Sequence, residues 1–141
     1  MEGIRLSSGT WDELVVRCRS VRDSVFVVER SVPAALEYAA DDSASLHVLA
    51  SLADGTAVGT GRLMPDGQIG RLAVLRSWRG HGIGGAMLAL LIEEARERSL
   101  VKIAVDAPVN LLVFFRDFGF GEIGERLVDA GGEHQPLELR L

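Results

Sequence analysis

The chain has 141 residues, of which 48% are hydrophobic and 25% are charged, and its formal net charge is −5. These values are typical of a globular protein, and the length predicts one domain, residues 1–141, around one hydrophobic core. The negative net charge argues against nucleic-acid binding. No apolar run approaches the ~20 residues of a membrane span, and the first residues do not resemble a signal peptide. We therefore expect a cytoplasmic protein without nucleic-acid or membrane partners.

The N-terminal half is expected to form a strand, a helix and three further strands. Residues 3–7 can form the first strand, and Thr10 and Glu13 have the spacing of a capping box, which predicts the start of a helix. Pro33 is expected to end this helix. Its apolar stripe would consist of Leu14, Cys18, Val21, Val25 and Val28. Within residues 46–75, the turn signals ADGT and PDG predict antiparallel strands joined by hairpins.

The C-terminal half is expected to alternate helices and strands. A helix over 82–99 would bury one face, made of Ile83, Met87, Leu90, Leu91 and Ala95. Residues 101–107 (VKIAVDA) predict a buried strand, and residues 110–120 a helix that Gly119 ends. The last two segments, residues 121–128 and 136–141, can pair as a final hairpin. Because most strands precede the main helix, the predicted fold class is α+β (α/β mixed), with helices on both faces of a mixed sheet.

Residues 79–85 (RGHGIGG) form a basic, glycine-rich loop between a strand and a helix. Glycines let the backbone approach an anion, the helix start offers free N–H groups, and Arg79 adds charge-assisted hydrogen bonds, so the loop is suited to phosphate. Gly80, Gly82 and Gly85 also satisfy G-x-G-x-x-G, and Asp106 follows where a ribose-binding acid would stand, as in nicotinamide oxidoreductases. The antiparallel strands before the loop and the short chain after Asp106 disfavour that fold, and no Walker A lysine follows.

The same loop matches R/Q-x-x-G-x-G/A over Arg79–Gly84, and here the chain resembles the GNAT superfamily of N-acetyltransferases. The segment NLLVFFRDFGF is similar to the family's N-x-x-A-x-x-[LF]-Y-x-x-x-G-F pattern, while VFVVERSVPAALEYAADD and the late GGEH resemble the ElaA-like branch. The resemblance covers most of the chain. It implies the GNAT acyl-CoA N-acyltransferase fold, a central, mostly antiparallel mixed sheet flanked by helices, with the fourth and fifth strands splayed apart.

The resemblance implies an enzyme that moves an acetyl group from acetyl-CoA directly to a primary amine. The acceptor is expected to be a small molecule, and the acids of EYAADD favour a cationic one. A homodimer is possible, and the sequence does not decide the oligomeric state. Asn110 could also be a helix N-cap. The residues expected to bind coenzyme A are Leu72, Ala73, Val74, Arg79, Gly80, His81, Gly82, Ile83, Gly84, Gly85 and Asn110.

An amine must lose a proton before it attacks a thioester, and carboxylates or histidines can accept that proton. The branch pattern points to Glu37 and His134 as the catalytic residues. Further candidates are Asp42, His47 and Asp106, and each of the five could instead have a structural role. The single cysteine and the separated histidines predict no metal site.

The chain departs from the family pattern where a proton donor is expected. Many relatives have a tyrosine that protonates the leaving thiolate, and here that position is Phe115. Arg30 and Ala39 replace a glutamine and an aspartate of the ElaA-like branch. The phenyl ring cannot donate a proton, so a second interpretation stays open, a module that binds acyl-CoA without efficient transfer.

Overall fold

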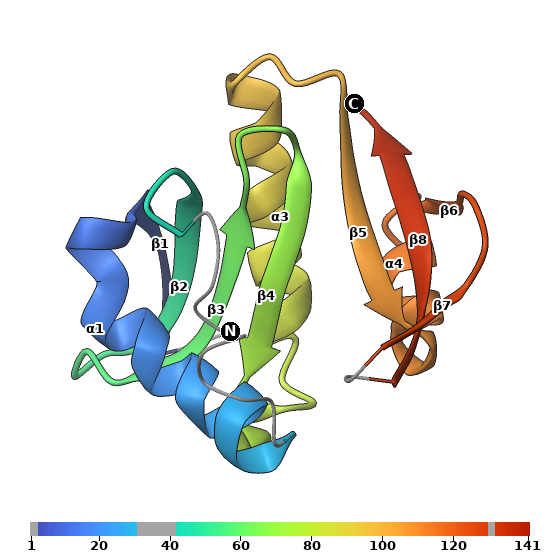
Figure 1. Cartoon of the computed structure of the whole chain (residues 1–141). Coiled ribbons are helices and arrows are strands. Elements are labelled where there is room, and N and C mark those ends of the chain that lie inside the picture. Colours follow the sequence, from blue (N-terminus) through green and yellow to red (C-terminus); the bar gives the residue numbers. More distant parts are fainter. Residues whose placement is uncertain (1–2, 31–41, 130–131) are drawn as a thin grey trace.

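The computed structural model describes residues 3–30, 42–129 and 132–141, and an eight-stranded mixed sheet forms its centre (Figure 1). The strands are ordered β1-β2-β3-β4-β5-β8-β6, and β7 also pairs with β8. Every pair is antiparallel except β4 with β5. The strands are β1 (Ile4–Thr10), β2 (Leu46–Leu52), β3 (Ala57–Leu63), β4 (Gln68–Val74), β5 (Lys102–Pro108), β6 (Gly121–Glu122), β7 (Leu127–Asp129) and β8 (Gly132–Arg140).

The parallel strands β4 and β5 separate, which confirms the splay that the sequence resemblance implies. They pair only where Gln68 and Ile69 face Ala104 and Val105, and then diverge toward their C-terminal ends (Figure 1). In β4 the register against β3 shifts, so that Arg71 and Leu72 together lie opposite one residue of β3. This β-bulge bends the strand. The facing edges of β4 and β5 therefore keep backbone groups that no strand partner uses.

Helix α1 (Trp11–Arg22) begins at the predicted capping box. The Thr10 hydroxyl accepts from the Glu13 N–H at 3.3 Å, and the Glu13 carboxylate accepts from the Thr10 N–H at 2.9 Å. The chain then continues as a π-helix, η1 (Asp23–Glu29). A π-turn holds more residues than an α-turn, so the predicted stripe rotates away from the sheet. Val28 is consequently 76% exposed, contrary to the prediction, whereas Val25 is buried.

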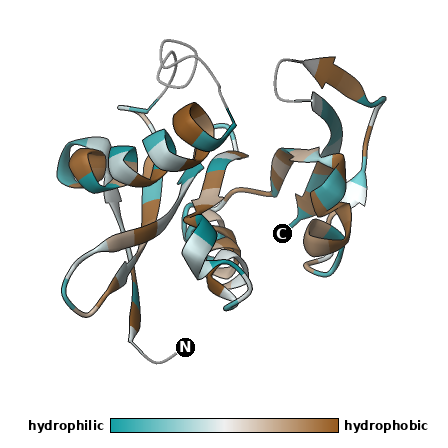
Figure 2. Ribbon diagram, turned by 90° about the horizontal axis from the view of Figure 1, so that it is seen from below, coloured by the Kyte–Doolittle hydropathy of each residue, from teal (hydrophilic) through white to brown (hydrophobic). Residues whose placement is uncertain are grey.

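Two hydrophobic clusters cover the two faces of the sheet. Figure 2 shows α1 on one side of the strands and α3 (Ile83–Glu97) with α4 (Leu112–Arg116) on the other. Neighbouring residues of β2 alternate between these clusters, since Leu49 packs with α1 and Val48 packs with α3. The predicted face of α3 is confirmed, although Leu90 is only half-buried. The buried side chains of α3 are Ile83, Met87, Leu88, Leu91, Ile92 and Ala95.

The predicted C-terminal helix is shorter than expected. A 3₁₀ turn, η3 (Val109–Leu111), precedes the five residues of α4. Its end is as predicted, because Gly119 has a φ of +97° and the N–H groups of Gly119 and Phe120 donate to Arg116 and Phe115 carbonyls. Phe120 is buried against the Phe115 ring. Within the described ranges, no helix has the length and hydrophobicity to cross a membrane.

Candidate functional site

The glycine-rich loop joins β4 to α3 at the point where β4 and β5 diverge. After β4 comes a 3₁₀ turn, η2 (Arg76–Trp78), and then Gly80 and Gly82 adopt φ values of +80° and +79°. Gly82 is the N-cap of α3 and provides no side-chain cap. A Cβ at either glycine would have no atom within 4 Å, so both face open space. The free N–H groups of the first turn of α3 therefore face the same space.

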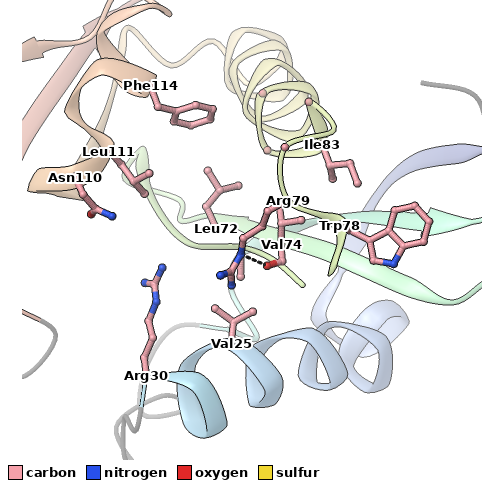
Figure 3. Close-up of a pocket in the computed structure, with 15 residues that line it drawn as sticks. Val25, Arg30, Leu72, Val74, Trp78, Arg79, Ile83, Asn110, Leu111 and Phe114 are labelled. Atoms are coloured by element: carbon pink, nitrogen blue, oxygen red, sulfur yellow. Dashed lines mark hydrogen bonds between the residues drawn. The ribbon is translucent and has the colours of Figure 1, made fainter. Parts of the chain in front are cut away.

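A cavity of about 460 Å³ lies in front of this loop, and we call it the loop cavity (Figure 3). Its wall joins the loop, the end of β4 and the start of the 3₁₀ turn η3. Arg30 and Asn110 extend toward each other across it. Ten residues expected to bind coenzyme A line it, namely Leu72, Ala73, Val74, Arg79, Gly80, Gly82, Ile83, Gly84, Gly85 and Asn110.

Two of the residues expected to bind coenzyme A, His81 and Asn110, lie differently from what the sequence suggested. His81 does not line the loop cavity; its ring lies 5.7 Å from that of Trp78, and its Nδ1 donates to the Trp78 and Arg79 carbonyls. Asn110 lies within η3, and no side chain caps η3 or α4, so the N-cap interpretation is wrong. The loop therefore faces the cavity with its backbone and with Arg79.

Arg79 is fixed at the edge of the loop cavity by Glu29 of η1. Its Nη1 and Nη2 donate to the Glu29 carboxylate at 2.8 and 2.7 Å, and its Nε donates to the Val74 carbonyl at 2.9 Å. Hydrogen bonding from Arg79 lowers the pKa of Glu29. Arg76 also contacts this carboxylate, at 3.5 Å. The guanidinium is thus oriented before any anion binds, with one N–H of each terminal nitrogen remaining.

A second cavity of about 290 Å³, the strand cavity, lies between the diverging parts of β4 and β5. It meets the loop cavity at Arg30, Leu72 and Leu111, which line both. The two cavities are therefore neighbours along β4. Three residues singled out from the sequence line the strand cavity: Asp106, Phe115 and His134.

The sequence matches the acetyltransferase (GNAT) domain over residues 11–141. The chain belongs to the GNAT acetyltransferase family. It is 33% identical over 119 residues to the uncharacterized N-acetyltransferase YjcF of Bacillus subtilis, covering 81% of this chain and 84% of that protein. The crystal structure of Escherichia coli ElaA has a TM-score of 0.84 at 21% identity, covering 95% and 98% of the two chains. A GNAT acetyltransferase from Elizabethkingia anophelis with acetyl-CoA bound has a TM-score of 0.67 at 15% identity, covering both chains fully at 100%.

The structure describes one of the two predicted catalytic residues, His134. Glu37 lies outside the described residues. His134, at the start of β8, is half-buried on the wall of the strand cavity, and its Nδ1 lies 3.0 Å from the Gly132 carbonyl oxygen. A carbonyl oxygen can only accept, so Nδ1 donates this hydrogen bond. Phe115 is 2% exposed, and its ring packs against Phe114 and Phe120. The position where the family pattern has a tyrosine hydroxyl therefore makes hydrophobic contacts.

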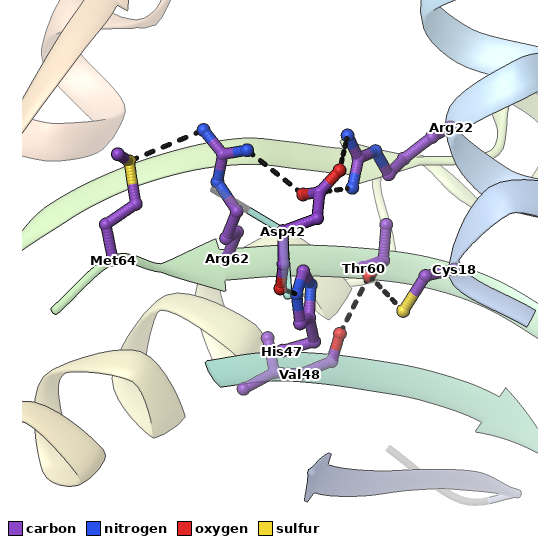
Figure 4. Close-up of polar contacts among 8 residues, drawn as sticks. All are labelled: Cys18, Arg22, Asp42, His47, Val48, Thr60, Arg62 and Met64. Atoms are coloured by element: carbon purple, nitrogen blue, oxygen red, sulfur yellow. Dashed lines mark hydrogen bonds and ion pairs between the residues drawn. The ribbon is translucent and has the colours of Figure 1, made fainter. Parts of the chain in front are cut away.

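Asp42 and His47 belong to a buried polar cluster and line neither cavity (Figure 4). Asp42 accepts from Arg22 at 2.9 and 3.2 Å and from Arg62 at 3.0 Å. Burial acts to raise the pKa of Asp42, but the two arginines outweigh it and hold that pKa below its usual range. The Nε2 of His47 donates to the Asp42 carbonyl oxygen at 2.9 Å, and its ring packs against Trp11. These two candidates therefore have a structural role.

His47 should make stability depend on pH. Burial lowers the pKa of His47, so the folded chain resists a proton that the unfolded chain takes up near pH 6.5. The free energy of unfolding should therefore fall as the pH drops from 7 to 5, by at most about 1.4 kcal/mol per pH unit from this residue. A His47→Gln variant should show a shallower slope in urea unfolding at several pH values. The exposed His81→Gln variant is the control, and equal slopes for His47→Gln and wild type would contradict the assignment.

Sequence reasoning missed the basic wall of the strand cavity, to which Arg30, Arg62 and Arg71 contribute. One signal was present, because Arg62 and Arg71 interrupt apolar runs that were expected to be buried strands. A charged residue within a buried strand needs a partner or a function. Within the described residues, no group of His, Cys, Asp and Glu side chains could hold a metal ion.

Proposed function

We propose that this protein transfers an acetyl group from acetyl-CoA to a primary amine of a small molecule. The observation that carries the proposal is that two cavities lie next to each other at the β4–β5 divergence and share wall residues. One cavity has the features of a phosphate site, and the other contains a residue that can accept a proton. Their meeting point is where a thioester and an amine would come together.

Bound acetyl-CoA would supply an acetyl group already activated as a thioester. The loop from Arg79 to Gly84 would hold its pyrophosphate through backbone N–H groups, the α3 dipole and the guanidinium. The unpaired edge of β4, Leu72 to Val74, would offer backbone groups to its extended arm. The backbone N–H near Val74 is the proposed polariser of the thioester carbonyl.

His134 is the proposed proton acceptor for the amine. An imidazole can take the ammonium proton, and the hydrogen bond from Nδ1 to the Gly132 carbonyl orients the ring. The amine nitrogen then forms a bond to the acetyl carbon, and the carbon–sulfur bond breaks to release a thiolate. The protonated His134 can return its proton to that sulfur. The nitrogen loses a second proton to solvent as the amide forms, so the protons balance without a tyrosine at the position of Phe115.

A thiol-release screen tests the proposal. Acetyl-CoA is mixed with the protein and a panel of primary amines, and free thiol is measured alongside acetyl-CoA binding by calorimetry. Binding together with amine-dependent thiol release is the expected result. Saturable binding without release for any amine would favour the alternative, an acyl-CoA-binding module. Absence of coenzyme A binding would overturn both.

A His134→Gln variant should lower kcat about 100-fold, which lies within the usual range for removing a general base. Acetyl-CoA affinity should stay unchanged, because His134 lies in the strand cavity alone. Steady-state kinetics beside calorimetry with acetyl-CoA is the measurement. Wild-type kcat in His134→Gln would exclude His134, and Asp106→Asn would then be examined in the same assay.

A further inference from the structure

Arg30 lies where the two cavities meet. Three residues line both cavities, and the other two, Leu72 and Leu111, have aliphatic side chains. Among the described residues, Arg30 is therefore the one polar side chain that belongs to both the loop cavity and the strand cavity. If the proposed function holds, the sulfur of the thioester comes to this meeting point, so Arg30 is the shared side chain that can interact with it by charge.

The position of Arg30 is set by η1 and by an aromatic ring. Its backbone N–H donates to the Val25 carbonyl at 3.0 Å, which closes the last turn of η1. Its guanidinium carbon lies 5.3 Å from the centre of the Phe26 ring, a cation–π contact through the face of the guanidinium that leaves its N–H edge for other contacts. Figure 3 shows the side chain extending toward Asn110 on the opposite wall. The residue is exposed, so a ligand in either cavity can reach it.

The leaving group needs stabilisation that Phe115 cannot give. When the carbon–sulfur bond breaks, both electrons stay on the sulfur, and a negative charge develops there. A free alkyl thiol has a pKa of about 8.5, so the thiolate is the less stable form at neutral pH, and a nearby positive charge stabilises it. A guanidinium remains protonated under these conditions. Arg30 is therefore suited to donate charge-assisted hydrogen bonds and not to act as an acid.

We propose that Arg30 is a catalytic residue that stabilises the departing thiolate of coenzyme A, at the point in the reaction where the family pattern uses a tyrosine. The guanidinium donates hydrogen bonds to the sulfur while the carbon–sulfur bond breaks, and it loses no proton. The sulfur then takes its proton from the protonated His134, as in the scheme above. Because the sulfur of the intact thioester carries no charge, the contact strengthens only as the reaction proceeds. Arg30 therefore acts on kcat and not on the binding of acetyl-CoA.

Other charged groups surround the same space. Glu29 precedes Arg30 in the chain, and its carboxylate is bonded to Arg79 of the loop. The remaining charged or titratable side chains of the strand cavity are Arg62 of β3, Arg71 of β4, Asp106 of β5 and His134 of β8. All of these groups are present in the wild type and in a variant of Arg30. A difference between the two proteins therefore reports on Arg30.

The thiol of bound coenzyme A tests the contact without any turnover. Thiolate absorbs in the ultraviolet, so a difference spectrum against the protein alone follows the ionisation of the bound thiol between about pH 6 and pH 9. The one cysteine, Cys18, does not interfere, because burial raises the pKa of its thiol. The acid dissociation constant of the bound thiol should be about tenfold smaller in Arg30→Gln than in the wild type. An equal constant in the two proteins would overturn the proposal.

Two further variants separate charge from structure and from distance. Arg30→Lys keeps the positive charge and should keep most of the wild-type acidity of the bound thiol. Arg76→Gln removes a charge whose side chain is 78% exposed and lines neither the loop cavity nor the strand cavity, so the bound thiol should be unchanged. The same loss of acidity in Arg30→Lys, or in Arg76→Gln, as in Arg30→Gln would overturn the assignment.

Kinetics separates this inference from the proposed function. With an amine that is acetylated, Arg30→Gln should lower kcat about tenfold, while calorimetry finds the affinity for acetyl-CoA unchanged. Acetyl transfer with wild-type kcat and wild-type thiol acidity in Arg30→Gln would reject the role of Arg30 and leave the proposed function standing. Thiol acidity that depends on Arg30, without acetylation of any amine, would uphold the contact with sulfur and reject acetyl transfer.

Discussion

Gly82→Leu is expected to weaken coenzyme A binding at least about 100-fold while the protein stays folded. Gly82 is the N-cap of α3 at φ +79°, and a Cβ there would project into open space next to the loop cavity. A leucine side chain would occupy the position that an anion must reach to contact the first N–H groups of α3. The left-handed φ adds strain of about 1 kcal/mol, which is small beside the stability of most domains.

The chain offers a closely matched control for this variant. Gly55, in the turn between β2 and β3, has φ +92° and also has no atom within 4 Å of a built Cβ, but it lines neither cavity. Gly55→Leu should therefore show a similar loss of thermal stability without a loss of affinity. Calorimetry with coenzyme A and thermal unfolding of both variants separate the two effects. Affinity of Gly82→Leu within threefold of wild type would contradict the loop assignment.

Local sequence signals predicted the ends of the elements well. The capping box at Thr10 and Glu13, the two hairpin turns, and the Gly119–Phe120 helix end all depend on residues close in sequence, and the structure confirms them. The π-helix η1 was not predicted, because its apolar residues fit an α-helical stripe equally well. Val28 illustrates this ambiguity. The change from an α-helical to a π-helical period moves its side chain from the predicted core to solvent.

In the candidate site too, one part could be predicted from neighbouring residues and the other part could not. The glycine loop is contiguous in the sequence, and its phosphate chemistry follows from glycine, a helix start and Arg79. The strand cavity joins residues from η1, β3, β4, β5 and β8, which only the folded sheet brings together. Arg71 lines the cavity because of a β-bulge in β4, and no sequence pattern predicted the register shift that forms this bulge. Similarly, the acidic character of the segment before β2 could not show that two arginines bind Asp42.

The largest change in stability is expected from Asp42→Asn, which should lower the free energy of unfolding by about 3 to 5 kcal/mol. Arg22 is 1% exposed and Arg62 is 7% exposed, so loss of the shared carboxylate would leave two buried guanidinium charges without its compensation. The asparagine side chain keeps the shape and one acceptor oxygen, so the effect reports on charge. Urea unfolding at pH 7 measures it.

Glu122→Gln provides the matched comparison, because the Glu122 carboxylate also lies between two arginines, Arg116 at 3.1 Å and Arg126 at 3.9 Å, but on the surface. Exposed ion pairs contribute little, so this variant should change the free energy of unfolding by less than about 1 kcal/mol. The two variants thus compare one arrangement of charges at two depths. A similar small change for Asp42→Asn would show that Arg22 and Arg62 find other compensation, and that Asp42 is not what holds Arg62 in the wall of the strand cavity.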